Sequence, residues 1–364
     1  MSGMLTGMKE RMEYPFSEKV RFFGRCADGT EIEARYFNWS GAGFTFSFVG
    51  SEVRCRLLGG ILGEGIPDEA SRAYIAVFVD DCADCTARFP ITRADGWYTL
   101  AEGLPWKQHT VRVIKDTEAG YGRAAVAAIE TDGYFADAPA PKKRRIEFIG
   151  DSITCGYGNL CSNASPDFIT AEESFVHTYA FFACEALGCE AEVVAASGNG
   201  FHRDYGCNFV NLIPELYEYT DKLLHGHLGL EPERWDFSHQ KCDLVVIKLG
   251  QNDFQYCSGA DLPEDQKTEQ RLQERRLEFE GSVRRFFKRL LEVRAGIPIL
   301  LIYESNMGLK KEILSGVSDF LTRVELLEIK PKQEYEGVGA NGHYSVCTHA
   351  RVGLLVAERI RELL

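Results

Sequence analysis

The sequence lacks any apolar run long enough to cross a membrane. Its best apolar stretches, residues 244–247 and 297–302, have the length of a strand, whereas a membrane-spanning helix needs about 20 apolar residues. Residues 1–16 contain no apolar stretch of the signal-peptide type. From these absences we expect a cytoplasmic protein that is not inserted into a membrane.

Positive charge is also in short supply. The 364 residues include 41 Lys and Arg against 54 Asp and Glu, which gives a net charge of −13. This balance argues against nucleic acid as a partner, because phosphate contacts require clustered basic side chains, and against binding to anionic membranes. The length predicts about two domains at roughly 150 residues each.

The sequence contains no recognisable pattern of metal ligands. Its 12 cysteines are scattered, and we expect reduced thiols. Cys82 and Cys85 form a single CxxC, which no second CxxC or spaced histidine pair accompanies. Because strand-like segments flank this motif, we interpret it as a hairpin turn, with redox or metal chemistry as the alternative.

Residues 1–140 have the texture of an all-β domain. Short segments rich in β-branched and aromatic residues are separated by Gly, Asp and Asn at intervals of roughly 8–12 residues, which is the spacing of a β-sandwich. A break follows at residues 136–145, ADAPAPKKRR, where two prolines and a basic run cannot continue a buried strand.

Residues 145–364 have a different texture. Strand-like segments at 144–150, 191–197, 243–250 and 297–305 alternate with helical periodicity, and the chain closes on an amphipathic helix. This alternation predicts a parallel sheet flanked by helices. The charged stretch 264–295 carries apolar residues at helical spacing, which predicts a surface helix with one buried stripe.

The most informative segment is the strand that ends in Gly150-Asp151-Ser152. Ligands of open α/β sheets lie beyond the carboxyl ends of the strands, so a serine in this turn is well placed to act as a nucleophile. Its own N–H can stabilise an oxyanion in the same space. Taken alone, the serine could equally be a helix cap.

Three further loops carry polar groups to the same edge of the predicted sheet. Gly198 follows one strand and lets a backbone N–H approach a substrate closely. Asn252 follows another strand and offers an uncharged amide donor. His343 precedes the last helix and is available as a general base.

These four blocks, in this order, resemble the SGNH (GDSL-type) hydrolase superfamily over residues 145–364. The resemblance implies a three-layer α/β/α sandwich with a parallel sheet. The strand pattern of the first domain, with TVRVIKDTE and the RWDF that precedes DLVVIKLGQND, is similar to the two-domain carbohydrate esterase family 2. In that family a jelly-roll-like β-sandwich precedes the SGNH domain, and members remove acetyl groups from polysaccharides or oligosaccharides.

The resemblance implies acyl transfer without metal or organic cofactor. Ser152 and His343 would be the catalytic pair, and the N–H groups of Ser152 and Gly198 with the Asn252 side chain would form the oxyanion hole. The family usually has an Asp two or three residues before the histidine, where this sequence has Ala340 and Asn341. We favour a Ser–His dyad whose histidine is oriented by a backbone carbonyl, as some carbohydrate esterases of this type are known to use.

Other polar residues have structural interpretations beside the functional ones. We expect Asp151 and Asp253 to support their turns through hydrogen bonds. Trp235, in an aromatic insert at 205–240, would either stack on a sugar ring or pack the insert against the sheet. His202 is the spare histidine nearest the oxyanion loop in sequence and is predicted, with Trp235, to contact the substrate. His349 is expected to be a packing residue of the last helix.

The expected partner is an acetylated oligosaccharide, and a homo-oligomer stays open. One alternative is a lipid or thioester hydrolase of the same superfamily, although the polar flank TCGYGNLCSNAS argues against an apolar groove. The other is a catalytically weak carbohydrate-binding protein, which the absent acid favours and the intact Ser, Gly, Asn and His oppose.

Overall fold

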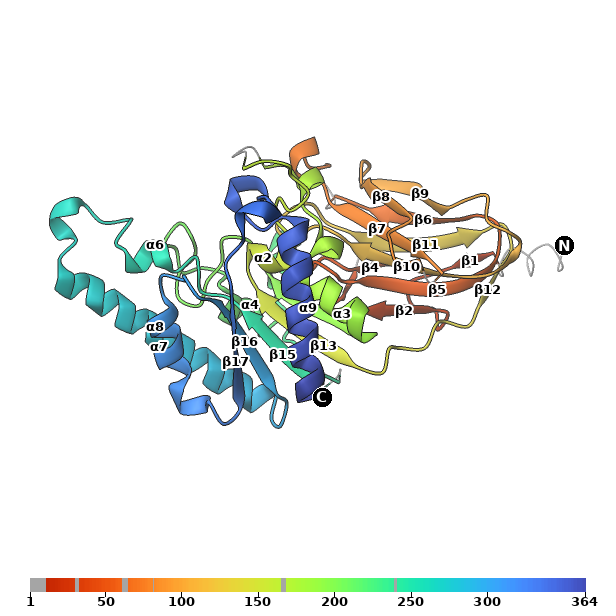
Figure 1. Ribbon diagram of the computed structural model, residues 1–364. Helices are drawn as coiled ribbons and strands as arrows, with labels where there is room; N and C mark the ends of the chain where they lie inside the picture. Colours follow the sequence, from red (N-terminus) through yellow and green to blue (C-terminus); the bar gives the residue numbers. More distant parts are fainter. Residues whose placement is uncertain (1–10, 30–32, 61–64, 81, 165–167, 239–240) are drawn as a thin grey trace.

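The computed structural model describes residues 11–29, 33–60, 65–80, 82–164, 168–238 and 241–364. Figure 1 shows an all-β part at the end that holds the N-terminus and an α/β part at the opposite end. The chain passes between the two parts after β12, and its last helix returns across the α/β part.

Two antiparallel sheets form the all-β part. One has the strand order β3-β4-β11-β6-β9 with β1 paired to β11, and the other has the order β12-β5-β10-β7-β8 with β2 paired to β5. The strands of the first sheet are β1 (Met12–Glu13), β3 (Ala27–Gly29), β4 (Ala34–Tyr36), β6 (Val53–Leu58), β9 (Asp95–Ala101) and β11 (Ala125–Thr131). Those of the second are β2 (Val20–Phe23), β5 (Gly43–Gly50), β7 (Tyr74–Val79), β8 (Ala87–Pro90), β10 (Lys107–Lys115) and β12 (Tyr134–Ala136).

Alternating side chains hold the two sheets together. Phe44, Phe46 and Phe48 lie on one side of β5 and are fully buried. Burying a Phe side chain contributes about 1.5–3 kcal/mol, so this one strand supplies much of the core. The facing strand β6 alternates buried apolar residues with exposed arginines, which is the pattern of a sheet with one face in water.

The α/β part is built on a five-stranded parallel sheet of order β14-β13-β15-β16-β17. The strands are β13 (Arg145–Gly150), β14 (Glu190–Ala195), β15 (Leu244–Lys248), β16 (Ile299–Glu304) and β17 (Val324–Ile329). After β13 the chain first adds β14 on one side and then β15 on the other. The carboxyl ends of β13 and β15 therefore flank a topological switch point, where ligands of such sheets bind.

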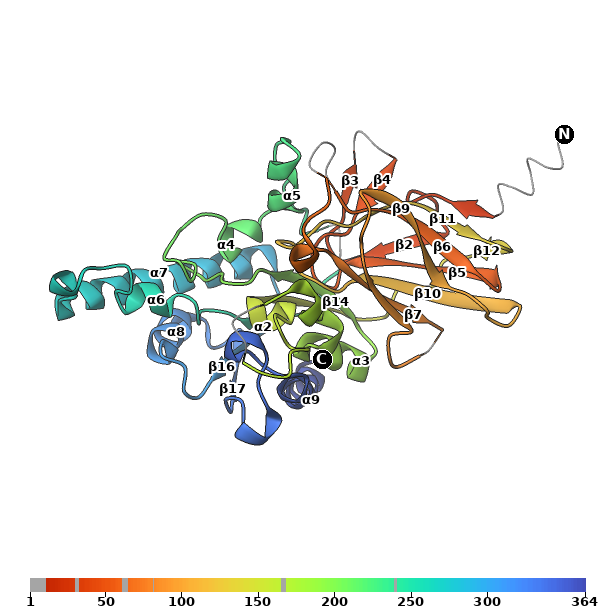
Figure 2. The ribbon, with the colours of Figure 1, turned by 90° about the horizontal axis from the view of Figure 1, so that it is seen from above.

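Helices cover both faces of this sheet. On one face Ile149, Val245 and Leu301 pack with α7 and α8, and on the other Phe148 and Val246 pack with α3 and α9. Figure 2 shows α7 and α9 on opposite sides of the strands. The helices are α2 (Ser152–Cys155), α3 (Tyr179–Leu187), α4 (Ile213–Leu216), α5 (Lys222–His227), α6 (Phe254–Cys257), α7 (Glu269–Val293), α8 (Lys310–Val317) and α9 (Val346–Leu363).

A buried arginine joins the two parts. Arg25, fully buried in the all-β part, donates to the carbonyls of Tyr217 (2.7 Å) and Tyr219 (2.8 Å) and to the Glu147 carboxylate (3.1 Å). Its guanidinium lies 4.9 Å from the ring of Tyr217 and 4.7 Å from that of Trp235. Because a buried charge is stable only when it is paired, these contacts require the two parts to dock in one orientation.

The predicted fold class is confirmed as an antiparallel β-sandwich followed by a three-layer α/β/α domain. The predicted surface helix is α7, with Phe279, Val283 and Phe286 in its buried stripe. The term jelly roll and the domain limits 1–140 and 145–364 stay predictions. Across the described ranges, no helix has both the length and the apolarity that a membrane crossing requires.

Candidate active site

The candidate nucleophile sits at the turn between β13 and α2. A Cβ on Gly150 would lie 2.0 Å from Thr154 Oγ1 and 2.9 Å from the Lys248 carbonyl oxygen, so only glycine fits at the end of the strand. Asp151 Oδ1 accepts the Ile153 N–H at 3.1 Å and caps the helix. Ser152 therefore begins α2 with its hydroxyl held at the carboxyl end of the sheet.

His343 reaches this hydroxyl from the other end of the sequence. Its Nε2 lies 2.9 Å from Ser152 Oγ, and its Nδ1 lies 2.9 Å from the Ala340 carbonyl oxygen. A carbonyl only accepts hydrogen bonds, so Nδ1 carries the proton and the neutral imidazole presents Nε2 as the acceptor for the serine hydroxyl. A backbone carbonyl thus performs the orienting role that the missing aspartate would have.

A tight turn presents that carbonyl. Asn341 has the left-handed backbone angle φ 49°, and its Nδ2 donates to the Tyr157 hydroxyl at 3.1 Å. The following Gly342 has φ 73°. Asn and Gly are the residues that tolerate such angles, and the turn directs the Ala340 carbonyl back toward His343. The Asn341 side chain thus has the Tyr157 hydroxyl as its partner, whereas the imidazole has the Ala340 carbonyl.

The oxyanion loop, residues 197–200 after β14, is held from several sides. Gly198 has φ 73°, and its carbonyl accepts the Tyr205 N–H at 2.7 Å. Asn252 Nδ2 donates to the Asn199 carbonyl at 2.7 Å, which leaves its second amide hydrogen for a ligand. Asp253 accepts the N–H groups of residues 201–203 at 2.7–2.9 Å.

Two backbone donors stay available at the site. Within the part of the chain that the structure describes, the N–H groups of Ser152 and Gly198 have no acceptor. Such donors are suited to stabilise the charge that develops on an ester carbonyl oxygen.

A polar cleft of about 430 Å³ opens over the dyad. One wall comes from the β13 and β15 corners and the other from the segment that precedes α9. The residues that line it are Asp151, Ser152, Ile153, Gln251, Asn252, Glu304, Asn306, Pro331, Lys332, Asn341, Gly342, His343 and Tyr344. The ring of Tyr157 lies 4.6 Å from that of His343 and 3.8 Å from that of Phe168, so a stack of aromatic rings supports the imidazole.

The surroundings of His343 favour its neutral form. Burial lowers its pKa below the usual 6.5, the hydrogen bond to Ala340 opposes this change, and the ammonium groups of Lys332 and Lys248 lower the pKa further. A histidine with a lowered pKa is already a free base at neutral pH. Asp151 is not a partner for the imidazole, since its carboxyl caps α2, and burial raises its pKa.

The structure does not place two of the predicted substrate contacts at this cleft. Trp235 lines a separate cavity between the insert and the β-sandwich, because the buried Arg25 guanidinium draws its ring into a stack. His202 turns onto α7, where its Nδ1 lies 2.8 Å from Ser282 Oγ, because the Asp253 carboxylate fixes the backbone there. Burial lowers the pKa of His202 to about 4.

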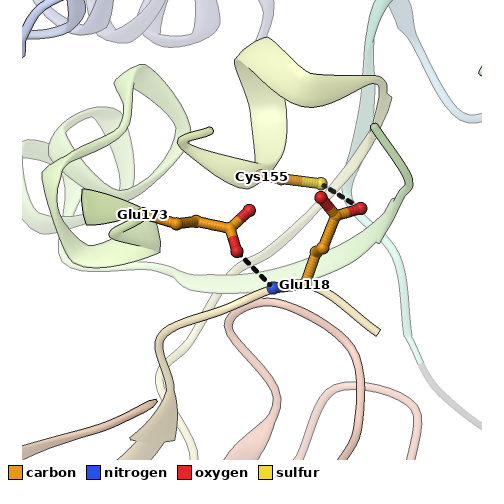
Figure 3. A group of neighbouring side chains, drawn as sticks. All are labelled: Glu118, Cys155 and Glu173. Carbon is orange, nitrogen blue, oxygen red and sulfur yellow. Dashed lines mark hydrogen bonds between the residues drawn. The ribbon is translucent and has the colours of Figure 1, made fainter. Parts of the chain in front are cut away.

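One group of possible metal ligands includes Cys155 of α2, the helix that Ser152 begins, and Figure 3 shows its three side chains. Among the described residues, ligand atoms of Glu118, Cys155 and Glu173 lie within 4.8 Å of one another, and all three side chains are buried. Sequence reasoning missed this group, because Glu118 belongs to the β-sandwich and the other two to the α/β domain. It also missed Tyr157, whose ring packs against His343. The turn that presents the Ala340 carbonyl could have been found, because Asn followed by Gly is a common turn sequence.

Comparison with known proteins bears on both domains. Residues 22–141 match the family model described as the carbohydrate esterase 2 N-terminal domain. The cellulase/esterase CelE of Acetivibrio thermocellus is 32% identical over 217 residues, 59% of this chain. The chain is similar to carbohydrate esterase family 2.

The chain also matches an acetylxylan esterase/glucomannan deacetylase of Cellvibrio japonicus, with 34% identity over 164 residues, or 42% of this chain. The chain spans only 24% of CelE and 42% of the Cellvibrio protein. A solved structure of a family two carbohydrate esterase from Clostridium thermocellum, in complex with cellohexaose, has a TM-score of 0.79 at 24% identity. That likeness covers 94% of this chain and 98% of the other, and it shows the common fold.

Proposed function

We propose that this chain is a serine esterase that removes O-acetyl groups from carbohydrates, such as xylo-, manno- or gluco-oligosaccharides. The observation that carries the proposal is the dyad, in which a serine hydroxyl and an oriented, neutral imidazole lie 2.9 Å apart. The relatives named as acetylxylan esterase and as cellulase/esterase support the class of substrate.

In the proposed mechanism His343 Nε2 takes the proton of Ser152 as the serine oxygen attacks the ester carbonyl. The charge on the former carbonyl oxygen is shared by the N–H groups of Ser152 and Gly198 and the amide of Asn252, each worth about 3 kcal/mol. Collapse of this intermediate breaks the bond to the sugar oxygen, which leaves with the proton from His343. A water molecule, deprotonated by the same imidazole, then attacks the acetyl-enzyme. The bond between the acyl carbon and Ser152 Oγ breaks, the imidazolium returns its proton to this oxygen, and acetate is released.

The cleft favours a small acyl group on a polar alcohol. Its lining contains amide, carboxylate and ammonium groups, and Glu304 accepts hydrogen bonds there from Tyr344 (2.5 Å) and Gln251 (3.1 Å). A long acyl chain would need an apolar groove to offset its removal from water. This lining weighs against the lipid or thioester hydrolase, and the assembled dyad weighs against a purely carbohydrate-binding protein.

The decisive experiment compares the wild type with Ser152→Ala. p-Nitrophenyl acetate, a long-chain p-nitrophenyl ester and acetylated xylo- and manno-oligosaccharides serve as substrates. Turnover of the acetyl esters should fall by at least about 10⁴-fold in Ser152→Ala, whereas Ser318→Ala, an exposed serine far from the dyad in sequence, should keep full activity.

Three results would count against the proposal. Absence of turnover of every ester by the wild type would leave the carbohydrate-binding alternative. Preference for the long-chain ester would favour the lipid hydrolase. Equal activity of the Ser152→Ala variant would place the chemistry elsewhere. The cytoplasmic location and the oligomeric state stay proposals, to be checked by cell fractionation and by light scattering.

A further inference from the structure

A carboxylate of the β-sandwich reaches the oxyanion loop of the α/β domain. Glu118 follows β10 and is buried at the junction of the two domains. Its Oε2 accepts the backbone N–H of Ser197 at 2.7 Å, directly before Gly198. The same oxygen lies 3.8 Å from the Cys155 sulfur in α2 (Figure 3). Glu118 therefore contacts both segments that carry the proposed oxyanion donors.

A second buried carboxyl group holds Glu118 in place. Glu173 Oε2 accepts the backbone N–H of Glu118 at 3.2 Å, and oxygens of the two carboxyl groups lie within 4.8 Å of each other. Each side chain otherwise has one oxygen, Oε1, without a donor. Two ionised carboxylates this close together would repel each other, and one proton on the pair removes that repulsion.

The nearby charges agree with one proton and one negative charge on the pair. Burial raises the pKa of Glu173 well above its usual range, and the neighbouring Glu118 carboxylate raises it further. The buried Lys115 ammonium donates to the carbonyls of Thr117 (3.1 Å) and Glu118 (2.6 Å) and supplies the compensating positive charge. The net charge of the three groups is therefore zero, and a buried cluster without net charge has a smaller desolvation penalty than a charged one.

We propose that Glu118 is a positioning residue for the oxyanion loop, held in reach of Ser197 by a protonated Glu173. The proposal rests on the esterase function proposed above. It gives the β-sandwich a part in the reaction. The Glu118 carboxylate fixes the peptide between residues 196 and 197, and this fixes the start of the loop so that the next N–H, that of Gly198, points at the developing oxyanion. The transition state would need this orientation more than substrate binding does.

Two variants separate the effect of the length of the Glu118 side chain from the effect of its negative charge. Glu118→Asp keeps the negative charge and withdraws the acceptor by about 1.5 Å. Glu118→Gln removes the charge but keeps an oxygen for Ser197 and an N–H for an ionised Glu173. We expect kcat for p-nitrophenyl acetate to fall about 10–100-fold in Glu118→Asp with KM within about threefold of the wild-type value, and Glu118→Gln to stay within about threefold in both. Glu173→Gln, which mimics the protonated carboxyl group, should also keep wild-type kcat.

Amide hydrogen exchange of residues 196–204 gives a readout that does not depend on turnover. Exchange should accelerate in Glu118→Asp and stay unchanged in Glu118→Gln. The proposal would be overturned if Glu118→Asp kept the wild-type kcat and the wild-type exchange rates. It would also be overturned if a folded Glu118→Gln variant lost tenfold in kcat. The second measurement decides the question even if Glu118→Asp does not fold. If the wild type shows no Ser152-dependent turnover, the proposed function fails and the exchange data alone decide the positioning role.

Discussion

The dyad can be tested by placing a carboxylate at position 341, where the resemblance to SGNH hydrolases leads one to expect an acid. In Asn341→Asp the new carboxylate would replace an amide that donates to the Tyr157 hydroxyl at 3.1 Å, whereas His343 Nδ1 already donates to Ala340. Asp tolerates the same left-handed backbone angle. The imidazole should therefore keep its present partner, and the maximal rate should stay within about tenfold of the wild-type value.

The added charge should still be visible in the pH profile. Taking a separation of about 6 Å for illustration, a carboxylate stabilises an imidazolium by about 0.7 kcal/mol at a dielectric constant of 80 and by about 2.8 kcal/mol at 20. This corresponds to a rise of about 0.5–2 units in the pKa of His343. Because the neutral imidazole is the active form, the acid limb of kcat/KM should move to higher pH by that amount.

The assay is kcat/KM for p-nitrophenyl acetate between about pH 4 and 9. Asn341→Gly is the matched control, since glycine accepts the backbone angle of 49° without adding charge, and its acid limb should not move. A gain of several hundredfold in Asn341→Asp would refute the reasoning. It would show that the Ala340 carbonyl is a poor substitute and that the dyad is an impaired triad.

Two further predictions concern the support of the site and the stability of the fold. A Cβ on Gly158 would lie 2.3 Å from the Ala340 Cβ, so Gly158→Ala should displace the orienting carbonyl and lower kcat/KM by about 10–100-fold. Gly188, with φ 61° close to the 59° of Gly158 but with open space around it, is the control. Gly188→Ala should lower stability by about 1–2 kcal/mol and leave kcat/KM unchanged. Equal losses of activity in the two variants would contradict this prediction. Burial lowers the pKa of His349 to about 3, so below its usual 6.5 the unfolded chain takes up a proton that the folded chain does not. The free energy of unfolding, measured in urea, should fall by about 1.4 kcal/mol per pH unit from this group as pH drops from 6.5. His349→Asn, which keeps an acceptor for the Tyr179 N–H, should remove about 3 kcal/mol of that loss by pH 4, and an unchanged slope would argue against it.

Much of the architecture could be predicted from local sequence. The alternation in β6 and the apolar stripe of α7 each record which face of an element is buried. The corners at Ser152, Gly198 and Asn252 could be placed at one edge because each follows a parallel strand, and parallel strands end on the same side of a sheet. Their common location at the switch point of the strand order follows from the topology.

Contacts between distant segments could not be predicted in the same way. Trp235 was expected either to stack on sugar or to pack the insert, and the docking of Arg25 places it in a separate cavity. Nothing near Glu118 in the sequence indicates that it will contact Ser197, because that contact exists only when two independently patterned domains meet.

The sequence by itself determined the two textures of the chain and the order of the blocks that carry Ser152, Gly198, Asn252 and His343, since periodicity and turn chemistry depend on neighbouring residues. Tertiary structure decided how the histidine is oriented. The Ala340 carbonyl takes this role because the turn at Asn341 directs a backbone acceptor, which every residue possesses, to the one nitrogen that needs it.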